Sequence, residues 1–283
     1  MRHLTLILFS TLILWAKVPD IVPVSWLKQH YNDPSLVLID VRNPKIYKAG
    51  HLKNSVNIPA MTQLFYGKKM LIPPLSTLKE LFSKAGIDNK SEIVVYGGEN
   101  PIWAARFYWI AKVLGASDVG LLKVSYGNWA KGTLPTTTKL YNPPYKDFAP
   151  KINNQYIKTQ LDVLTSLHNA HIIDGRPHAF YIGKKSHAKR YGHIPTALNF
   201  PGSLTYNTKD SKTTIKDFTK LKKLYTKLPK DKPIILYCED GADAAMNFLI
   251  LKKLGYQVSV YDGSWLEWGN HPHLPIETKV NKP

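Results

Sequence analysis

The chain contains a single cysteine, Cys238, in a setting typical of a reactive thiol. The short apolar run before it, residues 234–237, is bounded by Pro233 and predicts a buried strand. Gly241 and an apolar pattern with helical spacing follow, and this pattern stops at Gly255. A thiol at such a strand-to-helix turn faces the positive helix end and unpaired backbone N–H groups, which lower its pKa and make it a nucleophile. The alternative is a buried, inert cysteine.

Three carboxylates, Glu239, Asp240 and Asp243, lie in the loop after this cysteine. One carboxylate about 7 Å from the sulfur, at an effective dielectric near 20, opposes ionisation by roughly 2.4 kcal/mol. Lowering a thiol pKa by about two units requires roughly 2.7 kcal/mol, so one inward carboxylate would cancel the activation. We therefore expect these side chains to point away from the sulfur or to cap the helix start, where negative charge is favourable.

The elements that would position the thiol occur twice in the chain. Five features recur in the same order: Asp40 and Asp174, Arg42 and Arg176, Gly50-His51 and Gly192-His193, Asn57 and Asn199, Pro59 and Pro201. A repeat longer than 100 residues indicates two copies of a domain, because solenoid repeats have periods of 20 to 50 residues. We expect a first domain over residues 17–135 and a second over 153–283. The Pro- and Thr-rich residues 136–152 between them are expected to form an extended linker.

Strands alternate with helices in both copies. The predicted strands are residues 36–40, 93–96, 119–122, 234–237 and 258–261; the predicted helices are residues 25–30, one that begins with a Thr77-x-x-Glu80 capping box and ends near Gly86, 102–114, 215–228, and one that ends at Leu254. This order predicts an α/β fold, with each domain a parallel sheet covered by helices on both faces. In such sheets ligands bind beyond the carboxyl ends of the strands, which is where Cys238 falls.

The segments YCEDGADAAMNFL and VYDGSWLEWG resemble the catalytic half of the tandem-domain rhodaneses, the thiosulfate and 3-mercaptopyruvate sulfurtransferases. The family pattern is Cys-x-x-Gly-x-[Thr/Arg]-Ala with Tyr-Asp-Gly-Ser-Trp downstream. The resemblance implies two rhodanese-like domains. It also implies that Cys238 accepts a sulfane sulfur as a persulfide from a small anionic donor and passes it to a thiol or to cyanide. We expect no cofactor, and no metal because the sequence has neither an HExxH nor a CxxC pattern.

The resemblance places the substrate-binding residues in the loop after the cysteine and near the second Asp-x-Arg. These residues are Glu239, Asp240, Gly241, Ala242, Asp243 and Ala244, together with Arg176 and Phe180. The family shows a second Arg, which helps to hold the anionic donor, where this chain has Phe180. We therefore expect weak catalysis with thiosulfate. Other cations nearby could substitute, namely Lys184, Lys185, Lys189 and Arg190.

The first copy has Gly97 at the place of Cys238, so it cannot carry sulfur. Because the Asp-x-Arg and Gly-His features occur in both copies and only one has a thiol, we expect these residues mainly to hold the fold. The general-base role for His193 is correspondingly disfavoured.

Two other functions are weighed against sulfur transfer. A phosphatase or arsenate reductase on a related loop needs Cys-x5-Arg, and Ala244 stands where that Arg would be. A non-catalytic binding module, which keeps the fold and has lost donor recognition, stays open because of the acidic loop and Phe180.

The formal net charge is +18, and nine lysines lie between residues 209 and 232. Because no nucleic-acid-binding motif accompanies them, we interpret these lysines as a solvated face and expect no nucleic-acid partner. Residues 1–16 place Arg2 and His3 before an apolar stretch too short to span a bilayer, which predicts a cleaved secretory signal. An uncleaved anchor and a buried first helix are the alternatives. We expect export to the periplasm or outside, with no stable membrane span after cleavage.

Overall fold

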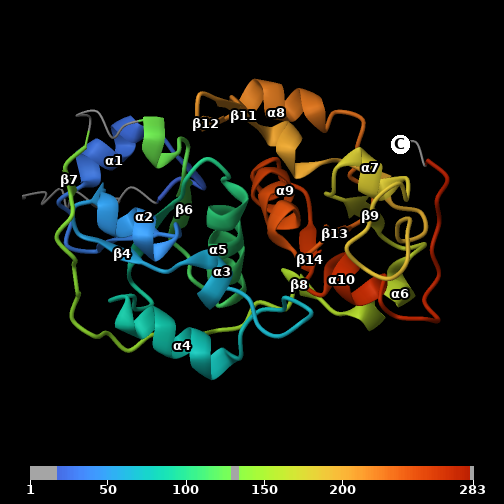
Figure 1. Ribbon diagram of the computed structural model, residues 1–283, viewed down its shortest axis with the longest axis horizontal. Coiled ribbons are helices and arrows are strands. Elements are labelled where there is room, and N and C mark those ends of the chain that lie inside the picture. Colours follow the sequence, from blue (N-terminus) through green and yellow to red (C-terminus); the bar gives the residue numbers. More distant parts are fainter. Residues whose placement is uncertain (1–17, 129–133, 281–283) are drawn as a thin grey trace, which may run out of the picture.

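The computed structural model describes residues 18–128 and 134–280, which form two α/β halves lying side by side (Figure 1). The predicted signal, residues 1–16, lies outside these ranges. No helix within the described ranges is long and apolar enough to cross a membrane.

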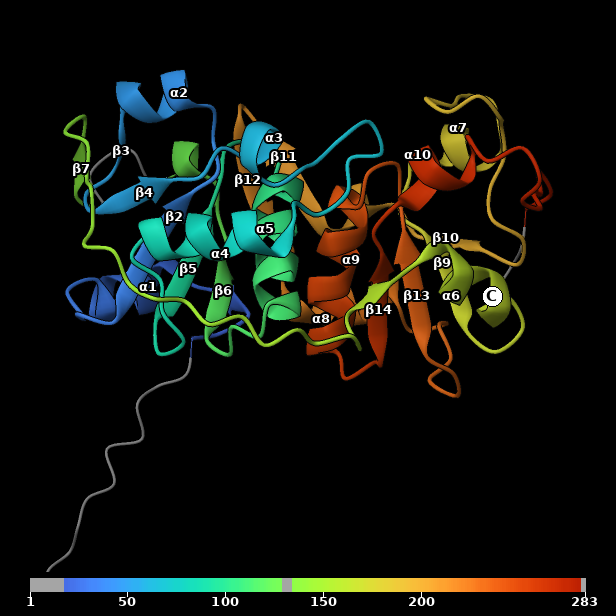
Figure 2. The ribbon, with the colours of Figure 1, turned by 90° about the horizontal axis from the view of Figure 1, so that it is seen from below.

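Each half is built on a five-stranded parallel sheet. The first sheet has the order β1 (Ile21–Val22), β6 (Val119–Leu122), β5 (Glu92–Tyr96), β2 (Leu36–Asp40) and β4 (Ser55–Asn57). The second has the order β10 (Leu198–Asn199), β9 (His171–Asp174), β13 (Ile234–Tyr237), β14 (Val258–Tyr261) and β8 (Ile157–Lys158). The central strands are buried and apolar because helices cover both faces of each sheet (Figure 2). The predicted fold class is confirmed.

The helices of the first half are α1 (Val24–His30), α2 (Pro44–Ala49), α3 (Ala60–Gln63), α4 (Leu75–Lys84) and α5 (Ile102–Val113). Those of the second half are α6 (Gln160–Ser166), α7 (His178–Tyr181), α8 (Phe218–Leu224), α9 (Ala242–Lys253) and α10 (Ser264–Trp268). The described residues also include two short 3-10 helices, η1 (Tyr126–Asn128) and η2 (Gly202–Thr205).

Two predicted features are wrong. The Thr77-x-x-Glu80 capping box does not form, because α4 already begins at Leu75 after Pro74 and has no side-chain cap. The predicted helix over residues 215–228 is shorter, because β12 (Lys212–Ile215) pairs with β11 (Tyr206–Lys209) in an antiparallel hairpin before α8 begins. Lysine and threonine give this hairpin no apolar alternation, so the sequence pattern did not reveal it.

The two halves meet along α5 and α9, the helices that follow the central strands of the two sheets. These helices lie side by side in both views (Figures 1 and 2). Nearly every side chain of each helix is buried, which is expected of helices enclosed on all sides. Phe248 on α9 contacts the rings of Tyr108 and Tyr156, and Trp109 Nε1 donates to Tyr156 O. The core is therefore continuous between the halves.

Two further segments connect the halves. The β11–β12 hairpin of the second half bonds to the end of β6 in the first, with Ser125 N donating to Thr213 O and Ile215 N to Lys123 O, both at 2.9 Å. The expected linker begins with β7 (Thr136–Thr137), which pairs with β3 (His51–Leu52), and residues 138–156 then contain no helix or strand. Phe148 within it is fully buried. This segment follows the surface of the first half as an extended strap (Figure 2).

Candidate active site around Cys238

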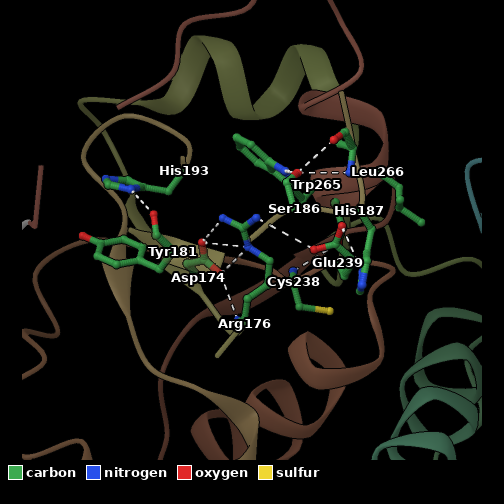
Figure 3. Close-up of polar contacts among 12 residues, drawn as sticks. Asp174, Arg176, Tyr181, Ser186, His187, His193, Cys238, Glu239, Trp265 and Leu266 are labelled. Carbon is green, nitrogen blue, oxygen red and sulfur yellow. Dashed lines mark hydrogen bonds and ion pairs between the residues drawn. The ribbon is translucent and has the colours of Figure 1, made fainter. Parts of the chain in front are cut away.

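The strand ends of the second sheet are joined by a buried ion pair. Arg176 donates through Nε and Nη2 to the carboxylate of Asp174, and through Nη2 to Gly192 O at 2.7 Å (Figure 3). The hydroxyl of Tyr237, at the end of β13, donates to the same carboxylate at 2.6 Å. Charged hydrogen bonds with this geometry are strong, so they fix the position where β9 and β13 end.

The first half repeats this network where there is no thiol. Arg42 donates to Asp40 and, through Nη2, to Gly50 O at 2.7 Å. The network is therefore part of the fold in both halves. Arg176, which the sequence also placed among the substrate-binding residues, has 1% of its surface exposed and is committed to this structural pair.

Each Gly-His feature is structural in the same way. His193 stacks on Tyr181 at 3.9 Å between ring centroids and bonds through Nδ1 to Tyr181 O at 2.8 Å. His51 and Tyr47 repeat both contacts in the first half. Figure 3 shows His193 on the side of the network away from Cys238. Burial lowers the pKa of His193, so the ring is neutral at neutral pH.

Cys238 lies directly after β13, on the turn into α9, as predicted. Gly241 adopts a left-handed backbone with φ of +88°, which favours glycine, and its N–H donates to Sγ at 3.1 Å. Backbone N–H groups of Asp240 and Ala244 also act to lower the thiol pKa. On the other side, Cys238 N donates to Ser264 Oγ at 3.2 Å. The amides predicted to surround the sulfur are thus in place.

The ionisation state of the thiol nevertheless differs from the sequence prediction. Cys238 has no exposed surface, and its pKa is raised well above the ordinary value, first by burial and then by Asp240 and Asp243. The predicted lowering of this pKa is therefore wrong for this conformation. Desolvation and two carboxylates outweigh the amides, so the resting sulfur is a protonated thiol.

The predicted orientation of the loop carboxylates is also partly wrong. Asp240 Oδ1 accepts from Ala242 N at 3.1 Å, so it caps the start of α9 as expected. The same oxygen also lies 3.8 Å from Sγ, facing the thiol instead of pointing away from it. Asp243 is largely buried, and burial together with Asp240 raises its pKa to about 7. Ala242 and Ala244 have small side chains that let this turn pack closely.

Glu239 lies on the other side of the turn. Its carboxylate is 3.8 Å from Arg176 Nη1 and 3.7 Å from His187 Nδ1, and neither carboxylate oxygen has a hydrogen-bond partner among the described residues (Figure 3). The ring of Phe180 lies 5.0 Å from that of His187. His187 therefore contacts both Phe180 and Glu239.

Sequence reasoning missed the roles of His187 and Ser264. Ser264 is within the quoted Tyr-Asp-Gly-Ser-Trp segment, so its place was recognised and its hydrogen bond was not. Of the cations considered as substitutes for the missing arginine, Arg190 bonds through Nη1 to His271 O and Leu274 O, which ties it to the C-terminal segment. Within residues 18–128 and 134–280, no group of three or more His, Cys, Asp or Glu side chains could hold a metal ion.

We expect Asp240→Asn and Asp243→Asn each to lower the pKa of the Cys238 thiol, because each removes a negative charge that opposes ionisation. One unit in pKa corresponds to a roughly tenfold change in thiolate fraction, so alkylation by iodoacetamide at pH 7 is expected to be about tenfold faster in Asp240→Asn. The gain in Asp243→Asn should be smaller, because the pKa of Asp243 is about 7 and its carboxyl is only about half ionised at that pH. Asp210→Asn, in the exposed tip of the hairpin, is the matched control and should match the unsubstituted chain. Equal alkylation rates in all four proteins would contradict the electrostatic account.

The comparisons with known proteins agree with this geometry. The model of the rhodanese-like domain matches residues 23–132 and 158–271. Thiosulfate sulfurtransferase of Azotobacter vinelandii is 30% identical over 269 residues, covering 93% of this chain and 98% of the relative. The 3-mercaptopyruvate sulfurtransferase of Escherichia coli K12 is 29% identical over 276 residues, covering 90% and 97%. The crystal structure of SseA from Escherichia coli superimposes with a TM-score of 0.76 at 27% identity, covering 87% of this chain and 98% of that one. The chain, with two rhodanese-like domains in tandem, belongs to the rhodanese family.

Proposed function

We propose that this chain is a sulfurtransferase in which Cys238 carries a sulfane sulfur as a persulfide. The donor is a small anion of the thiosulfate or 3-mercaptopyruvate type, and the acceptor is a thiol or cyanide. The observation that carries the proposal is the Gly241 N–H directed at Sγ from 3.1 Å, on the turn that follows the central strand. The sulfurtransferases among the relatives match nearly the whole chain, which supports the same reaction class here.

The reaction has two displacements. The Cys238 thiolate attacks the outer sulfur of the donor, forming an S–S bond while the donor bond to that sulfur breaks and the leaving group takes the electron pair. The acceptor then attacks the terminal sulfur and restores the thiolate. Backbone amides stabilise the negative sulfur in both steps. Because the resting thiol is protonated, a base must first remove its proton.

A non-catalytic binding module is the second candidate. The observation that favours it is the complete burial of Cys238 together with its raised pKa. A module predicts no covalent sulfur on Cys238 under any donor, whereas a sulfurtransferase requires it.

The proposed mechanism predicts a covalent persulfide on Cys238. Incubation of the intact protein with thiosulfate or 3-mercaptopyruvate is expected to add the mass of one sulfur atom to the peptide that contains Cys238, and Cys238→Ser should remove the addition. The replacement is nearly the same size, so the fold should survive, which circular dichroism checks. Failure of the wild-type chain to gain sulfur from a panel of donors would favour the binding module.

The second prediction concerns donor selectivity. Phe180→Arg places a cation near the acidic turn, where an anionic donor must approach, and is expected to raise kcat/KM for thiosulfate by about tenfold, which corresponds to about 1.4 kcal/mol. Phe218→Arg is the matched control, because Phe218 is an exposed phenylalanine on α8. An unchanged kcat/KM in Phe180→Arg would show that position 180 does not limit recognition of the donor.

We also propose that the chain is exported and that its signal is cut after Ala16. The support is the basic start and the short apolar stretch of residues 4–16. Expression of the full chain in a Gram-negative host is expected to yield, in the periplasm, a protein whose N-terminal residue is Lys17 by mass spectrometry. A chain that keeps Met1 and remains with the membrane fraction would identify an uncleaved anchor instead.

A further inference from the structure

We propose that Arg106, on the half without a thiol, is a positioning residue for the Cys238 turn: its guanidinium holds the backbone at Gly241 and supplies positive charge beside the loop carboxylates. The inference rests on the proposed sulfur transfer and explains what the first half contributes to it.

Arg106 lies on α5 at the contact between the halves and has no exposed surface. Its Nη2 forms an ion pair with Asp262 Oδ1 at 2.9 Å and donates to Met70 O at 3.3 Å. The guanidinium also lies over the rings of Phe65 and Trp109, at 4.8 and 4.7 Å from their centroids. A buried arginine held on so many sides has one fixed position, so it can transmit that position to whatever it touches.

The guanidinium packs directly against the catalytic turn. A Cβ atom added at Gly241 would lie only 2.4 Å from Arg106 Nη1, which places this nitrogen against the backbone of Gly241. The N–H of Gly241 is the group that donates to Sγ of Cys238. Movement of Arg106 would therefore move a hydrogen-bond donor of the sulfur.

Asp262 connects Arg106 to the other side of the turn. Its Oδ2 accepts from Ile72 N at 2.8 Å, so it is bonded to the first half twice. Two residues later in the chain, Ser264 Oγ accepts from Cys238 N. The first half thus holds the Cys238 turn at two places. Arg106 packs against the backbone of Gly241, and the contacts of Asp262 hold the backbone that leads to Ser264.

Arg106 is paired with Asp262, but part of its guanidinium makes no hydrogen bond. Its Nε and Nη1 atoms have no hydrogen-bond partner among the residues that the structure describes. The charged groups around the turn are Asp262 beside Arg106, Asp240 and Asp243 beside the sulfur, and Glu239 with Arg176 and His187 on the far side. Positive charge behind Gly241 favours the ionised sulfur, so its removal is expected to raise the pKa of the thiol further.

The position of Arg106 holds a cation in α5 and an apolar residue in α9. Counting back from the matching Leu-Gly ends at residues 114–115 and 254–255, Met246 stands in α9 where Arg106 stands in α5. Gly97, after the strand that precedes α5, has no side chain to ionise. The repeat therefore has methionine in α9 at the position where α5 has the arginine that lies against the Cys238 turn.

The test compares three variants: Arg106→Met, Arg106→Lys, and a double variant that combines Arg106→Met with Asp262→Asn. The double variant removes both members of the ion pair, so it leaves no unpaired buried carboxylate and can be measured if Arg106→Met alone fails to fold. The full chain is used, and Lys112→Met is the matched control, because Lys112 is a mostly buried cation on the same helix whose ammonium bonds to Ser117 O. Urea unfolding of each variant measures its stability separately from its reactivity.

The main readout is the rate of Cys238 alkylation against pH. We expect folded Arg106→Met and the double variant to react about tenfold more slowly at pH 8 and to have their profiles displaced to higher pH, with persulfide formation slowed in parallel. Arg106→Lys keeps the charge and should restore the profile in part, whereas Lys112→Met should match the unsubstituted chain. Unchanged profiles in the folded Arg106 variants would overturn the inference. Failure of the unsubstituted chain to form a persulfide would instead overturn the proposed function, because the alkylation profile does not require a donor.

Discussion

The left-handed backbone at Gly241 is the constraint on which the half that contains Cys238 depends. It turns an N–H toward the sulfur of Cys238 and leaves room for the guanidinium of Arg106 behind it. A side chain at this position would have to adopt a backbone conformation that L-residues rarely take and would also collide with Arg106. The local geometry and the contact between the halves therefore require glycine at the same residue for separate reasons.

The two halves show what duplication kept and what it changed. The Asp-x-Arg pair, its bond to the carbonyl before histidine, and the Tyr–His stack recur almost atom for atom. These contacts join strand ends and do not touch the sulfur. Three features differ near the turn: Gly97 stands in place of Cys238, Arg106 in place of Met246, and the first-half turn carries one carboxylate, Glu99, where the second carries three. The chemistry thus resides in a few substitutions on a frame that both halves share.

The sequence predicted the frame well because buried parallel strands are continuous apolar runs. The runs ending at Leu122, Tyr237 and Tyr261 were located to the residue, and the repeat revealed the pairing of the halves. The position of Cys238 followed from the same reasoning. Its ionisation did not, because the pKa depends on depth of burial and on side-chain directions, which no local pattern encodes.

The contribution of Arg106 was beyond the reach of sequence periodicity for a related reason. From sequence alone, an arginine in an apolar helix is expected to lie at the surface. Only the packing of α5 on α9 shows that Arg106 is enclosed. The hairpin was missed because its strands, YNTK and KTTI, are mostly polar and show no apolar alternation. Both cases depend on contacts between residues that are far apart in the chain.

The β11–β12 hairpin, which bonds to the backbone after β6, also affects when the first half can complete its hydrogen bonds during synthesis. Lys123 and Ser125 find their backbone partners at Ile215 and Thr213, some 90 residues later in the chain. At a synthesis rate of about 5–20 residues per second, the backbone that follows β6 waits roughly 5–20 s for those partners to emerge. During that interval the nascent first half exposes both this backbone and the apolar surface of α5, which the second half covers in the complete molecule.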